Sequence, residues 1–389
     1  MKPLRYHLAE DTIDRADVDR LIGWLKTYPR LTQGEITRNF ESRWSRWLGR
    51  PRSVFCNSGS SANLLMFDAL LLSGRLRNRK VIVPSVGWVT SVAPAIQLGF
   101  EPIMCEADPD TFGLDLDHLE VLLKRHSPGA VMLVQVLGVP HKMTRLAALK
   151  KKHGFILLED ACAAVGAAVS GRKVGTFGDM SSFSFYFGHQ FSTIEGGMVS
   201  TADKGFHDLL LMLRSHGWSK DLDPRTHKAL VARYAIDDFH SPFVFYEPGF
   251  NLRSTDLNAF IGLGQLEKLD AMIAARRRNH AIYQALLGGS FYVQRPEPGS
   301  KTCSISFGLL AKDPKQRRRI VKALEQAGVE TRIFSAGNLG LHPFWSNRYG
   351  KASFPFADRI HHTGFFLPNN PALSPEMIRR ISRIVLEAA

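Results

Sequence analysis

Cysteine is scarce in this chain of 389 residues, and its arrangement excludes several kinds of site. The four cysteines lie far apart in the sequence and form no Cys-x-x-Cys pair: Cys56, Cys105, Cys162 and Cys303. A network of disulfides is therefore not expected, and the sparse usage favours a reducing, cytoplasmic compartment. The histidines show no spacing typical of metal ligands, so no metal site is predicted.

Long apolar runs are missing as well. No stretch approaches the roughly 20 apolar residues that a membrane-spanning helix needs. The first residues, Met1 to His7, also lack the hydrophobic stretch of a signal peptide. We therefore expect neither a membrane anchor nor export.

Positive charge is in excess, with a formal net charge of +14. Much of it sits in short clusters inside segments with helical periodicity, such as 276–278 and 317–319. No DNA- or RNA-binding motif accompanies these clusters, so nucleic acid is not predicted as a partner. Two compatible interpretations remain: solvated helix faces, and a positive field that attracts an anionic substrate such as a nucleotide-diphosphate sugar.

Short apolar runs alternate with amphipathic segments, which predicts an α/β fold with a mostly parallel sheet flanked by helices. Seven strands are expected, at 53–56, 80–83, 102–105, 130–134, 155–158, 181–185 and 197–200. Helices are expected between them at 62–72, 117–125 and 143–153. A long helix over 257–278 leads into a smaller C-terminal region, which contains a strand at 305–310 and a helix at 315–327.

A small-residue turn, Asn57-Ser-Gly59-Ser60-Ser, lies between an expected strand and an expected helix. Glycine lets the backbone approach a ligand closely, and free amides at a helix N-terminus attract phosphate. Such a turn is also common as a simple helix cap, so the motif is weak on its own.

Two further candidates follow expected strands. Asp160 ends an apolar run, where a carboxylate can face a pyridine nitrogen and keep it protonated. Trp88 follows another strand, where an indole can stack on a planar ring. A capping or ion-paired aspartate and a core tryptophan are the ordinary alternatives.

Two more residues come from the middle of the chain. Asn251 lies in Gly249-Phe-Asn-Leu-Arg253, a turn before the long helix that could present polar groups across a subunit boundary. A helix-capping turn is the alternative. His216 precedes a glycine after a helix, and it is either a structural histidine or a group that assists a leaving hydroxyl.

His189 is the most informative residue. It lies five residues after Ser184 and is followed by Glu195-Gly-Gly197. Taken together and in this order, the motifs resemble the sugar-nucleotide aminotransferase family of the aspartate aminotransferase fold (type I), and the resemblance covers nearly the whole chain. In that family a lysine occupies the position of His189 and binds pyridoxal phosphate (PLP) covalently. An imidazole cannot form this bond, but it can move protons near neutral pH.

The resemblance implies an α/β fold with a large cofactor-binding domain over 1–262, built on a mixed, mostly parallel seven-stranded sheet, and a smaller α/β domain over 263–389. It also implies a homodimer with shared active sites. The cofactor residues that it implies are Gly59, Ser60 and Ser184 at the phosphate, Trp88 over the ring, Asp160 at the pyridine nitrogen, and Asn251 at the phosphate of the neighbouring subunit.

The histidine points to the dehydratase branch of the family. The branch implies that PLP and its amine form, pyridoxamine phosphate (PMP), bind without a covalent bond. His189 would act as the base and His216 would help the hydroxyl to leave. The implied reaction removes the C3 hydroxyl of a nucleotide-linked 4-keto-6-deoxyhexose, preferably the GDP-linked mannose derivative of colitose-type pathways. L-glutamate would regenerate PMP. No iron–sulfur cluster is expected, because such a cluster needs four thiolate ligands and the cysteines of this chain are not clustered.

Two other functions stay open. A sugar aminotransferase could work with free PMP and deliver an amino sugar. A catalytically inactive member could instead serve binding or regulation. Degenerate enzymes usually lose several site groups together, whereas only the lysine is missing here.

Overall fold

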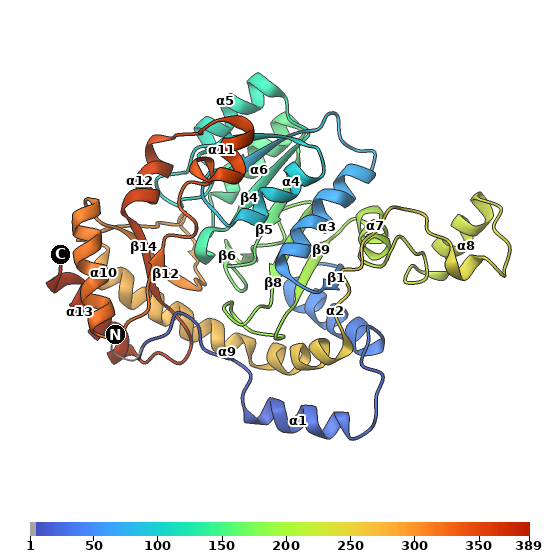
Figure 1. Ribbon diagram of the computed structural model, residues 1–389, viewed down its shortest axis with the longest axis horizontal. Helices are drawn as coiled ribbons and strands as arrows, with labels where there is room; N and C mark the ends of the chain where they lie inside the picture. The colour runs from blue at the N-terminus through green and yellow to red at the C-terminus, as the bar shows by residue number, and fades with distance from the viewer. Residues whose placement is uncertain (1–4) are drawn as a thin grey trace.

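The computed structural model describes residues 5–389 and is built around a seven-stranded sheet (Figure 1). The strand order is β1-β9-β8-β5-β4-β2-β3, and only β9 runs antiparallel to its neighbours. The strands are β1 Arg52–Cys56, β2 Lys80–Pro84, β3 Glu101–Cys105, β4 Ala130–Val134, β5 Ile156–Asp160, β8 Met180–Ser184 and β9 Gly197–Thr201. The expected mixed, mostly parallel sheet is therefore confirmed, with strand ends shifted by one or two residues.

Helices cover both faces of this sheet because alternate residues of each strand point to opposite sides. In β4, Met132 packs in the core beneath α3 and α7, whereas Val131 packs in the core beneath α5 and α6. The helices of this part are α1 Arg15–Leu25, α2 Glu35–Leu48, α3 Gly59–Leu72, α4 Ala93–Gln97, α5 Leu116–His126, α6 Met143–His153 and α7 Lys204–Arg214.

The long helix α9, Asp256–Leu287, connects the two ends of the molecule. Its first half packs on α2, where Gly262 allows close approach: a Cβ there would lie 2.8 Å from the ring of Phe40. The helix extends beyond the expected end at residue 278, because Tyr283 and Leu287 are buried in the C-terminal core. The expectation of a solvated face at 276–278 is wrong for Arg276, which is 1% exposed.

The C-terminal region forms its own four-stranded sheet in the order β10-β12-β14-β13, with antiparallel pairing throughout. Its elements are β10 Tyr292–Val293, β12 Ser306–Leu310, α10 Pro314–Gln326, β13 Arg332–Ile333, α11 Pro343–Tyr349, α12 Pro355–Thr363, β14 Gly364–Pro368 and α13 Pro375–Glu387. Tyr6 near the N-terminus is buried in the same core. The division at 262 and 263 stays a prediction, since α9 runs through it without a break.

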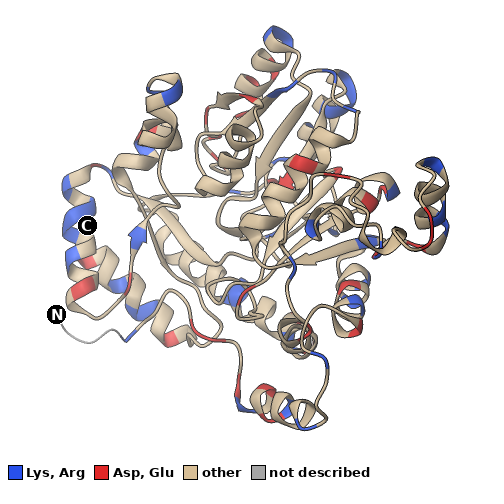
Figure 2. Cartoon of the chain, turned by 45° about the vertical axis from the view of Figure 1, so that its right-hand side comes forward, with Lys and Arg blue, Asp and Glu red and all other residues tan. Residues whose placement is uncertain are grey.

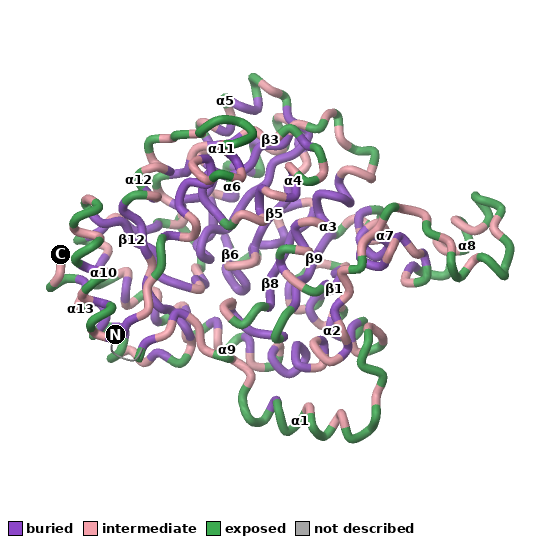
Figure 3. The backbone as a smooth tube through the Cα atoms, in the orientation of Figure 1, coloured by how far each residue is buried: buried purple, intermediate pink, exposed green. Residues whose placement is uncertain are grey.

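Two smaller features complete the fold. A three-stranded sheet in the order β11-β6-β7 comprises Ser300–Lys301, Ala168–Val169 and Arg172–Lys173. An arm around α8, Pro224–Arg233, projects away from the body and is exposed over most of its length (Figures 1 and 3). Charged residues lie mostly on the outer helices and loops, and the central strands carry few (Figure 2).

None of the helices within residues 5–389 combines the length and the apolar character that crossing a membrane would require.

Candidate active site

The carboxyl ends of the parallel strands carry most of the residues that the sequence singles out. Asp160 ends β5 and Ser184 ends β8, while Gly59 opens α3 just after β1 and Trp88 follows β2. In open parallel sheets this edge is where ligands bind. The fold therefore gathers at one edge groups that are up to about 125 positions apart in the sequence.

Asp160 is a buried carboxylate held only by neutral donors. Its Oδ2 accepts hydrogen bonds from Asn63 Nδ2 at 2.9 Å and Ser91 Oγ at 2.7 Å. Its Oδ1 accepts one from the Cys162 amide at 3.0 Å. The residue is 5% exposed, and within residues 5–389 no lysine or arginine pairs with it. A capping or ion-paired surface aspartate is thus excluded, and the negative charge is available to a cation from outside the chain.

The small-residue turn forms the N-terminus of α3. Ser58 is the N-cap and accepts a hydrogen bond from the Ser61 amide, so the motif does serve as a cap. The amides of Gly59 and Ser60 belong to the first turn, where the helix offers them no carbonyl partner. Gly59 also lies against β8: a Cβ at this position would come within 2.6 Å of the Ser184 Cβ. Glycine is therefore required for the turn to sit beside Ser184.

Trp88 is 60% exposed, so the alternative of a core tryptophan is wrong. It precedes a short 3-10 helix, Val89–Ser91, whose Ser91 is completely buried and donates to Asp160. The turn that carries the indole is thus tied to the carboxylate. An exposed flat ring beside a buried anion is suited to covering an aromatic cation.

His189 lies in the loop between β8 and β9. Its amide donates to the Tyr186 carbonyl at 2.9 Å, and its own carbonyl accepts from Arg276 at 2.8 Å. Its Nδ1 is enclosed and has no hydrogen-bond partner, whereas the residue as a whole is partly exposed. Burial lowers the pKa of His189 to about 4. The nearby Arg276 lowers this pKa further, while Asp160 and the Cys162 backbone oppose the shift. The ring is therefore a neutral base near pH 7, more fully so than an unperturbed histidine.

Arg276 holds the His189 loop in place, a role that the sequence pattern does not predict. Its guanidinium also donates to the carbonyls of Asn369 at 2.6 Å and Ile305 at 3.2 Å. It thereby joins the His189 loop to the C-terminal region through neutral acceptors alone. Burial lowers its pKa to about 10, so it stays charged at neutral pH.

His216 and Asn251 lie together at another part of this edge. Ser215 and Asn251 form a β-bridge, and Arg253 contacts His216 Nε2 at 3.3 Å and Asn251 Oδ1 at 3.0 Å. Neither residue contacts His189 within the chain. Asn251 is exposed and comes before Thr255, the N-cap of α9, so the helix-capping role belongs to Thr255.

The sequence profile of the DegT/DnrJ/EryC1/StrS aminotransferase family matches residues 12–386. The chain belongs to this family. A curated relative, the GDP-4-keto-6-deoxy-D-mannose 3-dehydratase of Yersinia pseudotuberculosis, is 30% identical over 98% of both chains. The E. coli GDP-4-keto-6-deoxy-D-mannose 3-dehydratase, solved with bound hydrated PLP, is 27% identical, with a TM-score of 0.89 over 98% of this chain and 100% of that one. A structure of that enzyme type with a trapped PLP-glutamate geminal diamine has a TM-score of 0.88, 27% identity and the same coverage.

These similarities confirm the aspartate aminotransferase-like fold and place the chain among PLP-dependent enzymes that modify sugars. The residues present fit PLP. The uncompensated Asp160 suits a protonated ring nitrogen, and the open amides of Gly59 and Ser60 suit a phosphate. No lysine stands at position 189, so the covalent bond of the family has no donor there.

Sequence reasoning missed Asn63, Ser91 and Arg276. Asn63 had a usable signal: it is one of two strongly polar side chains within the apolar part of α3, and it lies four residues after Gly59, on the same helix face. Ser91 and Arg276 had none, because only the folded chain brings them to Asp160 and His189.

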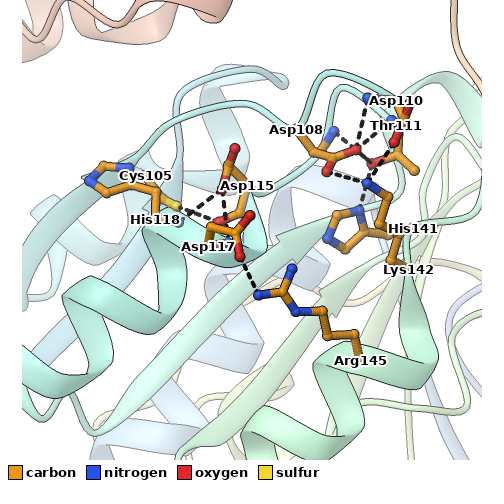
Figure 4. A network of polar contacts seen from close by, with 11 residues as sticks. Cys105, Asp108, Asp110, Thr111, Asp115, Asp117, His118, His141, Lys142 and Arg145 are labelled. Carbon is orange, nitrogen blue, oxygen red and sulfur yellow. Dashed lines mark hydrogen bonds and ion pairs between the residues drawn. The ribbon is translucent and has the colours of Figure 1, made fainter.

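A second polar network lies between β3 and α6 and is separate from this site (Figure 4). Lys142 reaches the carboxylates of Asp108 and Asp110 at 2.7 Å each, and Thr111 Oγ1 lies 2.6 Å from His141 Nδ1. Among residues 5–389 neither this network nor any other group of histidine, cysteine and acidic side chains has an arrangement that could hold a metal ion.

Proposed function

We propose that this protein is a PLP/PMP-dependent 3-dehydratase of a nucleotide-linked 4-keto-6-deoxyhexose, with GDP-4-keto-6-deoxy-D-mannose as the preferred substrate. L-glutamate regenerates PMP, and the products are 2-oxoglutarate, ammonia and a 4-keto-3,6-dideoxy sugar for colitose-type deoxysugar biosynthesis. The observation that carries the proposal is a neutral histidine at the position of the family's lysine, near a buried carboxylate that has no positively charged partner. The names of the similar dehydratases and the glutamate adduct in one of them support the substrate and the amino donor.

The cofactor-binding residues act through charge and shape. Gly59 and Ser60 donate backbone amides to the phosphate, and the Ser184 hydroxyl lies beside them. Trp88 would cover one face of the ring, and the Asp160 carboxylate would keep the ring nitrogen protonated. Charge-assisted hydrogen bonds contribute about 1.5–3 kcal/mol each, so several of them can supply the roughly 8 kcal/mol of micromolar affinity without a covalent bond.

PMP, when bound, supplies the amine that condenses with the C4 ketone and the ring that withdraws electrons from the reacting carbons. His189 would take the proton that leaves the cofactor's C4′ carbon, and it would accept this proton at Nε2, the ring nitrogen that is not enclosed. Its low pKa keeps this nitrogen free of a proton at neutral pH. His216 is the second catalytic group of the proposal, and its role is to assist departure of the C3 hydroxyl.

A homodimer belongs to this proposal, because the family resemblance assigns Asn251 to the cofactor phosphate of the neighbouring subunit. The arm at 219–247 supports an interface, because Phe239 and Phe243 on it are 86% and 72% exposed and could be buried against a partner subunit. Light scattering of the purified protein is expected to give twice the mass of one chain. A monomeric, fully active enzyme would contradict the shared site.

A product assay tests the reaction. Purified protein is incubated with PLP, L-glutamate and GDP-4-keto-6-deoxy-D-mannose. The sugar product is identified by mass spectrometry, and the ammonia released is quantified in parallel. A 3-deoxy sugar with stoichiometric ammonia is expected. An amino sugar would replace the proposal with a PMP-dependent aminotransferase. No turnover of GDP-, CDP- or dTDP-linked substrates would favour a binding or regulatory role.

A further inference from the structure

A basic pocket lies at the edge of the sheet opposite the active site. Its cavity of about 390 Å³ is formed by the C-terminal end of α2, the start of β1 and the β6–β7 hairpin. The lining side chains that matter are Arg46, Trp47, Arg50, Arg172, Lys173 and Thr176. Strand β1 begins at Arg52, beside this pocket, and ends at Cys56, beside the active site. A five-residue strand spans roughly 17 Å, so the two sites are separate.

Among residues 5–389 no carboxylate forms an ion pair with any of the four cations of the basic pocket. Arg50 donates to the Gly178 carbonyl, and Arg172 donates through Nε to Thr176 Oγ1 at 3.0 Å. Lys173 donates to the Trp47 carbonyl and lies 4.2 Å from the centre of that indole ring. Neutral acceptors thus hold these side chains in place without cancelling their charge.

The carboxylates nearest to the pocket are engaged elsewhere. Glu159 accepts hydrogen bonds from the amides of Gly175, Phe177 and Gly178. Asp179 pairs with Lys150 at 2.7 Å. Glu159 and Asp179 still attract Arg50, and Asp270 attracts Lys173. None of these carboxylates lines the pocket, so its lining stays positively charged.

Crowding of like charge within the pocket supports this conclusion. Burial lowers the pKa of Arg50, and the neighbouring Arg172 lowers it as well, while Glu159 and Asp179 oppose the shift. The Nε of Arg50 is enclosed and has no hydrogen-bond partner. Unpaired donors and repelling cations in one cavity favour an anionic ligand.

We propose that the basic pocket binds a diphosphate group, either as inorganic pyrophosphate or as part of a nucleoside diphosphate. Four cations need more than one negative centre, and arginine forks match phosphate oxygens in a bidentate manner. The basic pocket contains none of the proposed cofactor residues, so diphosphate binding there is independent of the proposed dehydratase reaction.

Calorimetry on the PLP-saturated enzyme at low ionic strength tests the proposal. Pyrophosphate is expected to bind to the wild-type protein at one site per chain and more tightly than orthophosphate does. The double substitution R46Q/R172Q is expected to weaken pyrophosphate at least tenfold, since each charge-assisted contact is worth that much. Both side chains are exposed, so folding is preserved.

The single substitution Arg318→Gln is the charge control, because Arg318 is exposed on α10 and far from the pocket in the fold. It is expected to leave pyrophosphate affinity unchanged. Equal weakening by Arg318→Gln, equal affinity for orthophosphate, or no binding to the wild-type protein would each overturn the proposal. Displacement of pyrophosphate by GDP would identify a nucleoside diphosphate as the ligand, and lack of displacement would identify inorganic diphosphate.

Discussion

His189 and His141 are two histidines with the same low basicity and different surroundings. Burial lowers the pKa of each to about 4, and each ring has one enclosed nitrogen without a hydrogen-bond partner. In His141 the other nitrogen is bonded to Thr111, and the residue is 1% exposed inside the network of Figure 4. In His189 the other nitrogen remains accessible. A lowered pKa therefore marks burial, and an accessible nitrogen near the buried carboxylate of Asp160 marks a candidate base.

Substitution of the two histidines should separate these roles most strongly. His189→Asn is expected to lower the rate of dehydration by about 10²–10⁴-fold, the usual contribution of a general base. His141→Asn is expected to leave the rate within a few-fold and to reduce the free energy of unfolding by about 1–3 kcal/mol. Product formation and urea unfolding measure the two effects. Equal loss of activity in both variants would contradict the assignment of a catalytic role to His189 and a structural role to His141.

The two aspartates beside these histidines give the next largest contrast. Asp160→Asn removes the anion proposed for the ring nitrogen and should weaken PLP binding by about 10–150-fold, the equivalent of one charge-assisted hydrogen bond. Asp108→Asn disturbs only the network of Figure 4 and should leave PLP affinity unchanged. Absorbance titration with PLP measures both. Unchanged affinity in Asp160→Asn would remove Asp160 from the cofactor site.

Acid should destabilise the fold through both histidines. The unfolded chain takes up a proton on each ring near pH 6.5, whereas the folded chain does so only near pH 4. The unfolded state thus binds more protons in this window, and stability falls as pH drops from about 6.5 to 4. His141→Asn should reduce this slope by at most about 1.4 kcal/mol per pH unit. Unfolding curves at several pH values check it; a slope unchanged by the substitution would contradict the buried, neutral state of His141.

Substitution of Arg276 should have a smaller effect, a shift in the pKa of His189. Removing a positive charge beside a base stabilises the protonated base, so Arg276→Gln should raise the pKa of His189. The acid limb of the pH–rate profile would then move to higher pH, while Arg276→Lys, which keeps the charge, should leave it in place. A purely structural role for Arg276 would lower the rate in both variants without moving the limb.

Much of the fold follows from local sequence signals, and the site follows only in part. The strands of the large sheet are apolar runs with clear ends, so all seven were predictable. The predicted end of helix α9 at residue 278 was too early. Up to that point its buried side chains pack in the core of the large sheet, and beyond it they pack in the core of the second sheet, which the local sequence does not reveal. Gly59, Trp88 and Asp160 meet at one edge because parallel strands place their carboxyl ends together. Ser91 and Arg276 were not predictable, since a buried serine and a buried arginine look like surface residues in a sequence.

The substitution His189→Lys gives the most direct test of the proposed function. We propose that an imidazole at this position leaves the cofactor without a covalent bond and serves as the base of dehydration. The variant should therefore attach PLP covalently, seen as a borohydride-stable mass increase, and lose formation of the 3-deoxy sugar. A variant that attaches no PLP and dehydrates at the wild-type rate would contradict the claim.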